Sequence, residues 1–265
     1  DSDGLPEILL GAYNTYIRGL GYAGRVYVCS GDQMSLLYTI DGDEPFGFFG
    51  FAGAVAGIGD IDSDGLADMA IGKAGFLQPG KLYAYSGTSP APDFTIDGPF
   101  FYWTYMSIAG AGDVDADGHD DFVIGACLEQ GGGVVRVFSG ATHQLLLQVS
   151  GQSLGALDFG RGVASAGDLD ADGKADLWIS APASDVPFTI GAGKVYAYSV
   201  AKASVLLSIK GQGQNEYLGE SLADAGDVDG DGTTDVVAGG RAGGDAGVVR
   251  VYSGKTGTKL LQMVG

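Results

Sequence analysis

Asp60-Ile61-Asp62-Ser63-Asp64-Gly65-Leu66-Ala67-Asp68 is the stretch that decides the fold of this chain, because the same nine-residue pattern recurs along the sequence. Further complete copies run from Asp113 to Asp121, from Asp168 to Asp176 and from Asp227 to Asp235. A fifth copy begins inside the pattern, with its third, fifth, sixth and ninth positions at Asp1, Asp3, Gly4 and Glu7. Carboxylates this close together repel one another unless a cation holds them. The pattern therefore predicts repeated calcium loops.

The spacing suits Ca²⁺, a hard ion that binds six to eight oxygen atoms. A chain that curls around the ion presents carboxylates from positions one, three, five and nine, while glycine at position six permits the sharp turn. The expected carboxylate ligands are Asp1, Asp3, Glu7, Asp60, Asp62, Asp64, Asp68, Asp113, Asp115, Asp117, Asp121, Asp168, Asp170, Asp172, Asp176, Asp227, Asp229, Asp231 and Asp235. Position seven carries unrelated side chains, as a backbone ligand predicts, and its expected carbonyl donors are Leu5, Leu66, His119, Lys174 and Thr233.

Two other interpretations of the acidic pattern are weaker. An EF-hand loop needs a glutamate at position twelve and flanking helices, but position twelve is Ile71, Ile124, Ile179 and Ala238, and the flanking runs are short and rich in glycine. A single acidic run is equally consistent with an exposed turn that binds no metal. Five copies in equivalent contexts favour calcium, up to five ions in all.

The composition limits which classes of fold the chain can adopt. The chain has 265 residues, is 45% apolar and contains 48 glycines, which suits many short strands joined by tight turns. No apolar run approaches the roughly 20 residues that span a bilayer, so no membrane span is expected. Cys29 and Cys127 occupy non-equivalent places, so we expect two small buried side chains and no disulfide framework.

The net charge of −19 is concentrated in the loops. The ligand positions of the five copies hold nineteen of the 33 acidic residues, three in the first copy and four in each of the others. Five calcium ions would bring the charge to about −9. The remaining negative charge argues against binding to nucleic acid or to an anionic membrane.

A longer repeat surrounds each loop. The first aspartates of successive loops lie 53, 55 and 59 residues apart, which is the size of one propeller blade. One apolar run precedes each loop and another follows it. The third run alternates between two faces, as in Gly24 to Gly31 and Gly133 to Gly140, and the fourth, as in Leu36 to Ile40, ends near a glycine. Four strands per repeat predict an all-β fold built from four-stranded blades.

These elements resemble the FG-GAP repeat family, whose best-known members are the β-propellers of integrin α subunits. The Phe-Gly pair of the family stands as Phe159-Gly160, altered as Phe51-Ala52 and Leu218-Gly219, and is lost at Thr104-Tyr105. The Gly-Ala-Pro element is best kept as Ser180-Ala181-Pro182 and partly kept as Gly11-Ala12 and Gly125-Ala126. The resemblance covers essentially the whole chain. It implies a propeller with a calcium loop between the first and second strands of each blade.

The predicted architecture is one propeller, or a propeller segment, of about five four-stranded blades. The expected blades are residues 1–42, 43–98, 99–151, 152–211 and 212–265. The first blade lacks the strand before its loop, which the resemblance implies is the innermost strand. We expect an upstream segment or a neighbouring subunit to donate a strand to that edge.

Function is predicted less specifically than fold. The first hypothesis is a calcium-stabilised extracellular or cell-surface module for binding or adhesion, which presents its loops to a protein or glycan partner. The alternative is a structural unit of a larger surface assembly or filament. An enzyme or lectin acting on polysaccharides is a third possibility, but His119 and His143 lie in no recognisable catalytic motif and most aspartates are assigned to calcium. We therefore expect no catalytic residues.

Two aromatic clusters precede acidic loops and could form a ligand surface. The first contains Phe46, Phe48, Phe49 and Phe51, and the second contains Phe100, Phe101, Tyr102, Trp103 and Tyr105. Aromatic rings at a blade junction ordinarily fill the space between blades, so packing is the preferred interpretation. Residues 13–22 and 183–192 are expected to form surface loops.

Overall fold

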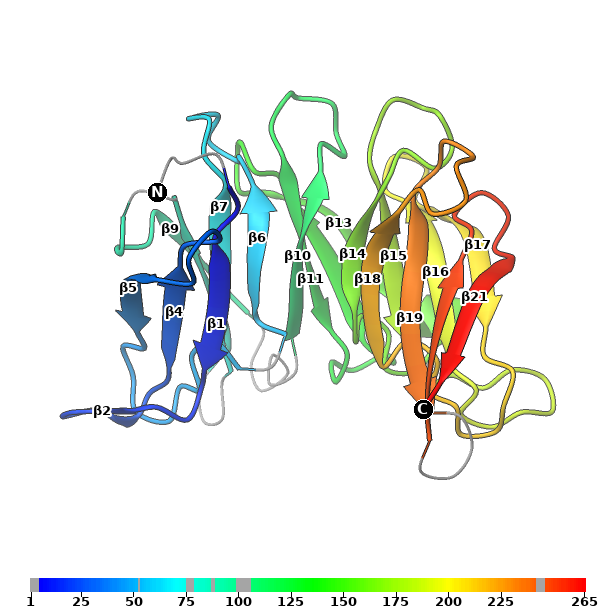
Figure 1. Cartoon of the computed structure of the whole chain (residues 1–265), viewed down its shortest axis with the longest axis horizontal. Coiled ribbons are helices and arrows are strands. Elements are labelled where there is room, and N and C mark those ends of the chain that lie inside the picture. The colour runs from blue at the N-terminus through cyan, green and yellow to red at the C-terminus, as the bar shows by residue number, and fades with distance from the viewer. Residues whose placement is uncertain (1–4, 52, 75–78, 87–88, 99–105, 242–245) are drawn as a thin grey trace. The chain divides into compact units, whose positions relative to one another are not determined.

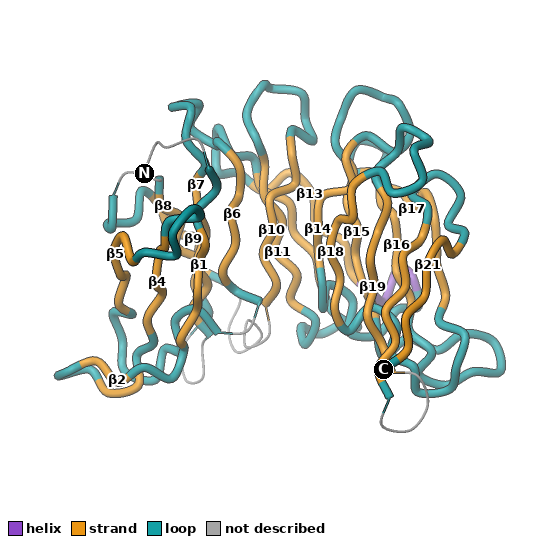
Figure 2. The backbone as a smooth tube through the Cα atoms, viewed as in Figure 1, coloured by secondary structure: helices purple, strands orange, loops and turns teal. Residues whose placement is uncertain are grey.

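The structure is a computed structural model of the chain, and it describes residues 5–51, 53–74, 79–86, 89–98, 106–241 and 246–265. Regular structure in these ranges is almost entirely β-strand, with one 3₁₀ helix, η2 (Gly151–Leu154) (Figure 2). The all-β prediction is confirmed. The chain divides into two compact units, residues 1–108 and 109–265. Within the described ranges, no helix is both long enough and apolar enough to cross a membrane.

The first unit contains two antiparallel sheets whose strands follow one another in chain order (Figure 1). The first sheet has three strands, β1 (Ile8–Ala12), β4 (Arg25–Cys29) and β5 (Leu36–Asp41). The second sheet has four, β6 (Val55–Gly59), β7 (Asp68–Lys73), β8 (Lys81–Tyr85) and β9 (Phe94–Asp97). A small hairpin joins β1 to β4 and consists of β2 (Tyr16–Ile17) and β3 (Gly21–Tyr22).

Three further four-stranded antiparallel sheets follow, each again in chain order. The first comprises β10 (Met106–Gly112), β11 (Asp121–Ala126), β12 (Val134–Phe138) and β13 (Leu145–Ser150). The second comprises β14 (Val163–Gly167), β15 (Asp176–Ala181), β16 (Lys194–Ser199) and β17 (Ser204–Lys210). The third comprises β18 (Ser221–Gly226), β19 (Asp235–Arg241), β20 (Gly247–Tyr252) and β21 (Lys259–Val264). The third and fourth apolar runs of each repeat are therefore strands, as their alternation predicts.

Each complete acidic loop joins the first and second strands of a four-stranded sheet. The pattern closes as a hairpin, because Gly59 pairs with Asp68, Gly167 with Asp176 and Gly226 with Asp235. A register shift just before each pair marks a β-bulge, which bends the strand as it enters the loop. The acid at position nine is accordingly the first residue of the second strand. That placement fixes its backbone in the ladder while its side chain faces the loop.

Apolar side chains from neighbouring sheets form the core within each unit. In the first unit Val26, Val28 and Phe49 pack with Ile71 and Tyr83. In the second unit the sheet of β10–β13 packs on that of β14–β17, and a separate cluster joins β14–β17 to β18–β21. The strands β7, β11 and β15 are buried at every residue. The second strand of each of these sheets is thus the rigid support of its acidic loop.

The Phe-Gly element connects one sheet to the next. The amide of Phe159 donates to the carbonyl of Gly132 in the preceding sheet at 2.8 Å, and the amide of Gly160 donates to the carbonyl of Ser180 in its own sheet at 2.8 Å. Gly160 has φ of +83°, and a Cβ there would lie 2.9 Å from Val135 Cγ2, so glycine is required. Leu218 and Gly219 make the equivalent bonds, as predicted.

The predicted match at Phe51-Ala52 is wrong. Phe49 and Gly50 make the equivalent bonds instead, to the carbonyls of Ala23 and Gly72 at 3.0 and 2.9 Å. Phe49 is 1% exposed, and Gly50 has φ of +74°. Two extra residues between Gly50 and β6 shift the spacing, so counting back from the loop selects the wrong phenylalanine. Thr104 and Tyr105 lie outside the described residues.

The first sheet has three strands where the others have four. Strand β1 pairs with β4 along its length and has no second partner among the residues that the structure describes. Cys29 and Cys127 are buried and unbonded to each other, as predicted from their positions.

Candidate metal sites

Position one organises each acidic loop through the backbone. Asp60 accepts hydrogen bonds from the amides of Asp64 at 3.0 Å and Gly65 at 2.9 Å, one on each carboxylate oxygen. Asp113, Asp168 and Asp227 make the same pair of bonds in their own loops, at 2.8–3.2 Å. The first aspartate therefore curls the following five residues around its own carboxylate, as an Asx-type turn does.

The aspartate at position nine is buried and hydrogen-bonds to the start of the loop. Asp68, Asp121, Asp176 and Asp235 are at most 2% exposed. One oxygen of each accepts the amide of position two, for example from Val114 to Asp121 Oδ2 at 2.8 Å, and the other three bonds measure 2.8–2.9 Å. The second oxygen of Asp121 accepts the amide of Gly140 at 2.9 Å, and that of Asp235 accepts the amide of Gly254 at 3.0 Å. These buried carboxylates are fixed in place before any ligand binds.

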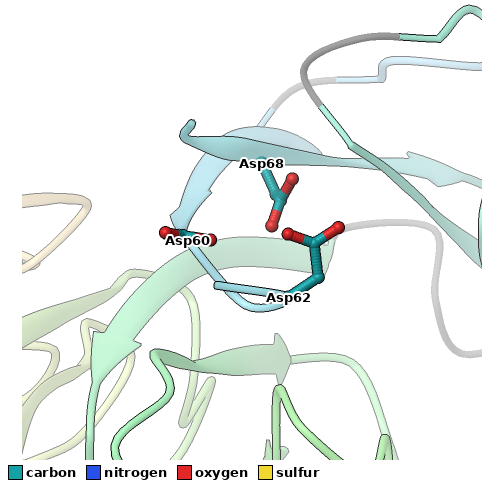
Figure 3. Close-up of side chains that lie close together, drawn as sticks. All are labelled: Asp60, Asp62 and Asp68. Atoms are coloured by element: carbon teal, nitrogen blue, oxygen red, sulfur yellow. The ribbon is translucent and has the colours of Figure 1, made fainter. Parts of the chain in front are cut away.

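The loops bring positions one, three and nine together. In each of the four loops these residues offer one carboxylate oxygen apiece, all within 4.8 Å of one another: Asp60, Asp62 and Asp68; Asp113, Asp115 and Asp121; Asp168, Asp170 and Asp176; Asp227, Asp229 and Asp235. Figure 3 shows the carboxylates of Asp62 and Asp68 facing each other, with Asp60 beside them.

Position five does not join these groups in the structure. Its carboxylate accepts the amide of position seven instead, as from Leu66 to Asp64 at 2.8 Å and from His119 to Asp117 at 2.9 Å. Asp1 and Asp3 of the first copy lie outside the described residues, so the carboxylates expected beside Glu7 are not placed.

The electrostatics of the clusters favour a cation. Burial, together with the neighbouring loop carboxylates, raises the pKa of Asp68, Asp121 and Asp176 to about 6. Burial and the adjacent Asp231 likewise raise the pKa of Asp229. A carboxylate that is costly to ionise becomes favourable to ionise once a cation lies beside it. A set of oxygen donors alone is the ligand set that Ca²⁺ and Mg²⁺ prefer, so the residues present fit calcium.

One loop differs from the others in residues outside the nine-residue pattern. Val200 stands in the β16–β17 turn where the other two turns of this unit have Gly140 and Gly254. A Cβ at Gly254 would lie 1.9 Å from the carbonyl oxygen of Thr234, so a valine cannot occupy the same position without a shift of the turn. No backbone amide of the described chain donates to Oδ1 of Asp176, and the same holds for Oδ1 of Asp68. The sequence signal was a valine where the equivalent turns of the other repeats in this chain have glycine, and pattern matching on the loop alone did not use it.

The lysine that follows in the same turn was also missed from the sequence. Lys202 Nζ lies 2.6 Å from Asp170 Oδ2 and 3.6 Å from Asp172 Oδ2. The signal was a basic residue in the hairpin turn beside an acidic loop, some 30 residues further along the chain.

The aromatic residues of the first cluster divide between packing and exposure. Phe49 is buried in the core, which confirms the packing interpretation for that ring, whereas Phe46 is 58% exposed. Phe46 lies 6.3 Å from Tyr22, and Tyr22 lies 5.8 Å from Tyr16 on the β2–β3 hairpin, measured between ring centroids. Phe100, Phe101, Tyr102, Trp103 and Tyr105 lie outside the described residues.

Comparison with known proteins agrees with this architecture. Residues 151–198 match the FG-GAP repeat model. Integrin alpha-4 from Xenopus laevis is 26% identical over 253 residues, which is 88% of this chain and 23% of that protein. Integrin alpha-5 from Xenopus laevis is 29% identical over 60% of this chain and 17% of that protein. Phosphatidylinositol-glycan-specific phospholipase D from Bos taurus is 29% identical over 54% of this chain and 20% of that protein. The chain thus spans about a fifth of the length of these relatives.

Proposed function

This chain is an FG-GAP repeat protein similar to integrin α subunits, and from that premise we propose that it is a calcium-stabilised module for binding or adhesion outside the cell or at its surface. Its partner is a protein or a glycan. The observation that carries the proposal is the fourfold recurrence of one carboxylate arrangement, held by the same backbone hydrogen bonds in every complete loop.

Calcium would bind in each loop through the carboxylates of positions one, three, five and nine and the carbonyl of position seven. Its role is to neutralise the clustered charge and so to stabilise the hairpins that hold the sheets. Position five, which hydrogen-bonds within the loop, would reach the ion through its other oxygen. With the first copy included, the chain would bind up to five ions.

The sheets serve in this proposal as blades of a propeller of about five blades, at residues 1–42, 43–98, 99–151, 152–211 and 212–265. Packing of neighbouring sheets within each unit and the connecting Phe-Gly bonds support it. The free edge of β1 is the place where a strand from outside these residues would pair.

The partner would dock at the ends of the sheets opposite the acidic loops. In an antiparallel sheet of this order, the connection from second to third strand and the connection to the next sheet lie together at that end. In the first unit these connections carry the aromatic surface, defined here as Tyr13, Tyr16, Tyr22, Phe46, Phe48 and Phe51. Tyr16 is 65% exposed and Tyr22 is 49% exposed. Exposed rings of this kind contact sugar rings and apolar side chains well.

Catalysis is not part of the proposal. The clustered aspartates have a structural use as cation ligands, and His143 lies in the exposed β12–β13 turn. One group of relatives is named as a phospholipase D, but the chain spans only a fifth of that protein.

The test measures binding of the calcium-loaded protein to panels of extracellular matrix proteins and glycans. The proposal expects binding to one of these classes that is lost in EDTA. The variants Tyr22→Ser and Phe46→Ser should weaken it at least about tenfold, the scale of an aromatic contact residue, without changing the melting temperature. Phe188→Ser is the matched control, since Phe188 is fully exposed in the other unit. Absence of binding to either class, or equal losses in the control, would overturn the proposal.

A further inference from the structure

Lys202 lies at the mouth of one acidic loop and not in the loop sequence itself. It belongs to the turn between β16 and β17, and its ammonium contacts Asp170 Oδ2 at 2.6 Å and Asp172 Oδ2 at 3.6 Å. These are positions three and five of the loop Asp168 to Asp176. Asp170 is also one of the three residues whose carboxylates cluster there. The lysine side chain is 49% exposed, whereas that of Asp170 is 14% exposed.

The residue at the equivalent position is uncharged in the two corresponding turns of the same unit. The amide of Lys202 donates to Ser199 Oγ at 3.3 Å, just as the amides of Thr142 and Thr256 donate to the serine three residues earlier, at 3.1 and 3.3 Å. These three residues therefore occupy one equivalent position. Threonine there is too short and uncharged to act as a counter-ion.

The other lysines near the loops contact backbone, not carboxylates. Lys255 Nζ lies 3.4 Å from the carbonyl oxygen of Asp231, and Lys174 Nζ lies 2.9 Å from that of Asp115. Among the ion pairs of the described ranges, those that involve acidic-loop carboxylates come from Lys202 alone. The same loop lacks the backbone amide that Gly140 and Gly254 give to position nine in the other two loops of this unit, and within the described residues the loop Asp60 to Asp68 shares this lack.

We propose that Lys202 is a tethered counter-ion of the loop Asp168 to Asp176, which makes this loop the weakest calcium site of the four complete loops and the one least dependent on calcium for its structure. The inference rests on the proposed calcium binding and adds a ranking of the sites. Its physical basis is competition: the ammonium engages an oxygen that the ion would use, and two cations a few ångströms apart repel. Partial exposure of the lysine limits the repulsion by screening.

Site-resolved occupancy tests the ranking directly. Crystals of the metal-stripped full chain would be soaked with increasing Ca²⁺, starting below one equivalent per loop, and ion density would be refined in every loop. We expect the loop Asp168 to Asp176 to fill last in the wild-type protein. Filling of this loop together with or before the other three would overturn the inference.

Variants at Lys202 supply the second arm, with calorimetric Ca²⁺ titration as the measurement. Lys202→Met should raise the affinity of the weakest site about three- to fivefold, in line with partly exposed charge pairs, and should lower the melting temperature in EDTA. Lys202→Arg should keep the weak site, and Lys255→Met should leave all affinities within about twofold, because its partner is a carbonyl. Unchanged affinities in Lys202→Met would refute the inference while leaving calcium binding intact. Absence of any calcium binding by the wild-type protein would instead refute the proposed function.

Discussion

The loops Asp113 to Asp121 and Asp168 to Asp176 are built from the same pattern and differ in what surrounds them. In both, the first aspartate accepts two loop amides and the ninth accepts the amide of position two. In the former the ninth aspartate also accepts the amide of Gly140 at 2.9 Å. In the latter that turn carries Val200 and Lys202, and the lysine reaches the carboxylates. The nine-residue pattern determines how the loop carboxylates are arranged. The residues of the adjacent turn determine how well that arrangement suits a divalent ion.

The largest effect is expected from removing the ninth carboxylate. Asp121→Ala leaves the amides of Val114 and Gly140 without their acceptor and removes a proposed calcium ligand. We expect a loss of about 2–4 kcal/mol in the free energy of unfolding and one fewer bound Ca²⁺. Asp176→Ala should cost less, about 1–3 kcal/mol, because it leaves one backbone amide without an acceptor.

Chemical denaturation and metal analysis check this pair. Asp120→Ala is the control, since Asp120 is position eight of the same loop, beside Asp121 but not one of the expected ligand positions. It should keep the full number of ions. Equal costs for Asp121→Ala and Asp176→Ala would break the comparison between the two loops.

A smaller effect should follow from placing valine, the residue found at Val200, in the turn beside the loop Asp227 to Asp235. Gly254→Val places a Cβ against the carbonyl of Thr234 and displaces the amide that Asp235 accepts. We expect a loss of about 1–3 kcal/mol, measured by thermal unfolding in calcium and in EDTA. Stability within 0.5 kcal/mol of wild type, on the scale of ordinary surface substitutions, would show that this amide contributes little.

A further effect is the pH dependence of the metal-free protein. The pKa of Asp68, Asp121 and Asp176 is raised to about 6 in the folded state from an ordinary value of 3.8, so between these values the folded chain holds more protons than the unfolded chain. In EDTA these groups make stability fall as pH rises from about 4 to 7. Asp121→Asn should flatten that slope by removing one titration.

Saturating calcium should reverse the dependence, because the ion binds the ionised carboxylates and acid displaces it. Thermal unfolding at a series of pH values, with and without calcium, measures the pH dependence of stability in both states. A stability in EDTA that rises with pH from 4 to 7 would contradict the assignment.

Much of the fold could be predicted from the sequence because its signals are local. Side chains alternate between two faces in β4, β12 and β20, and this alternation specifies a strand from the residues of the segment itself. The glycine-bounded runs and the nine-residue pattern specify strands and turns in the same local way. The clustering of positions one, three and nine follows from the hairpin that the pattern encodes. These features need no knowledge of what packs against them.

The remainder depended on contacts between segments far apart in the chain. Phe49 takes the connecting role predicted for Phe51 because two extra residues precede β6, and the deciding bonds run to Ala23 and Gly72. Lys202 reaches Asp170 across two strands, and position five turns to its own loop amide. Spacing within one motif carries no information about such neighbours.

The central claim, that the acidic loops bind calcium and stabilise the sheets through it, is tested most directly by calorimetric titration of the metal-stripped chain paired with its melting temperature. The account predicts at least four bound Ca²⁺ and a melting temperature that rises with calcium, since each site contributes about 2.7 kcal/mol at a hundredfold excess over its Kd. No heat of binding, together with the same melting temperature in calcium and in EDTA, would contradict it.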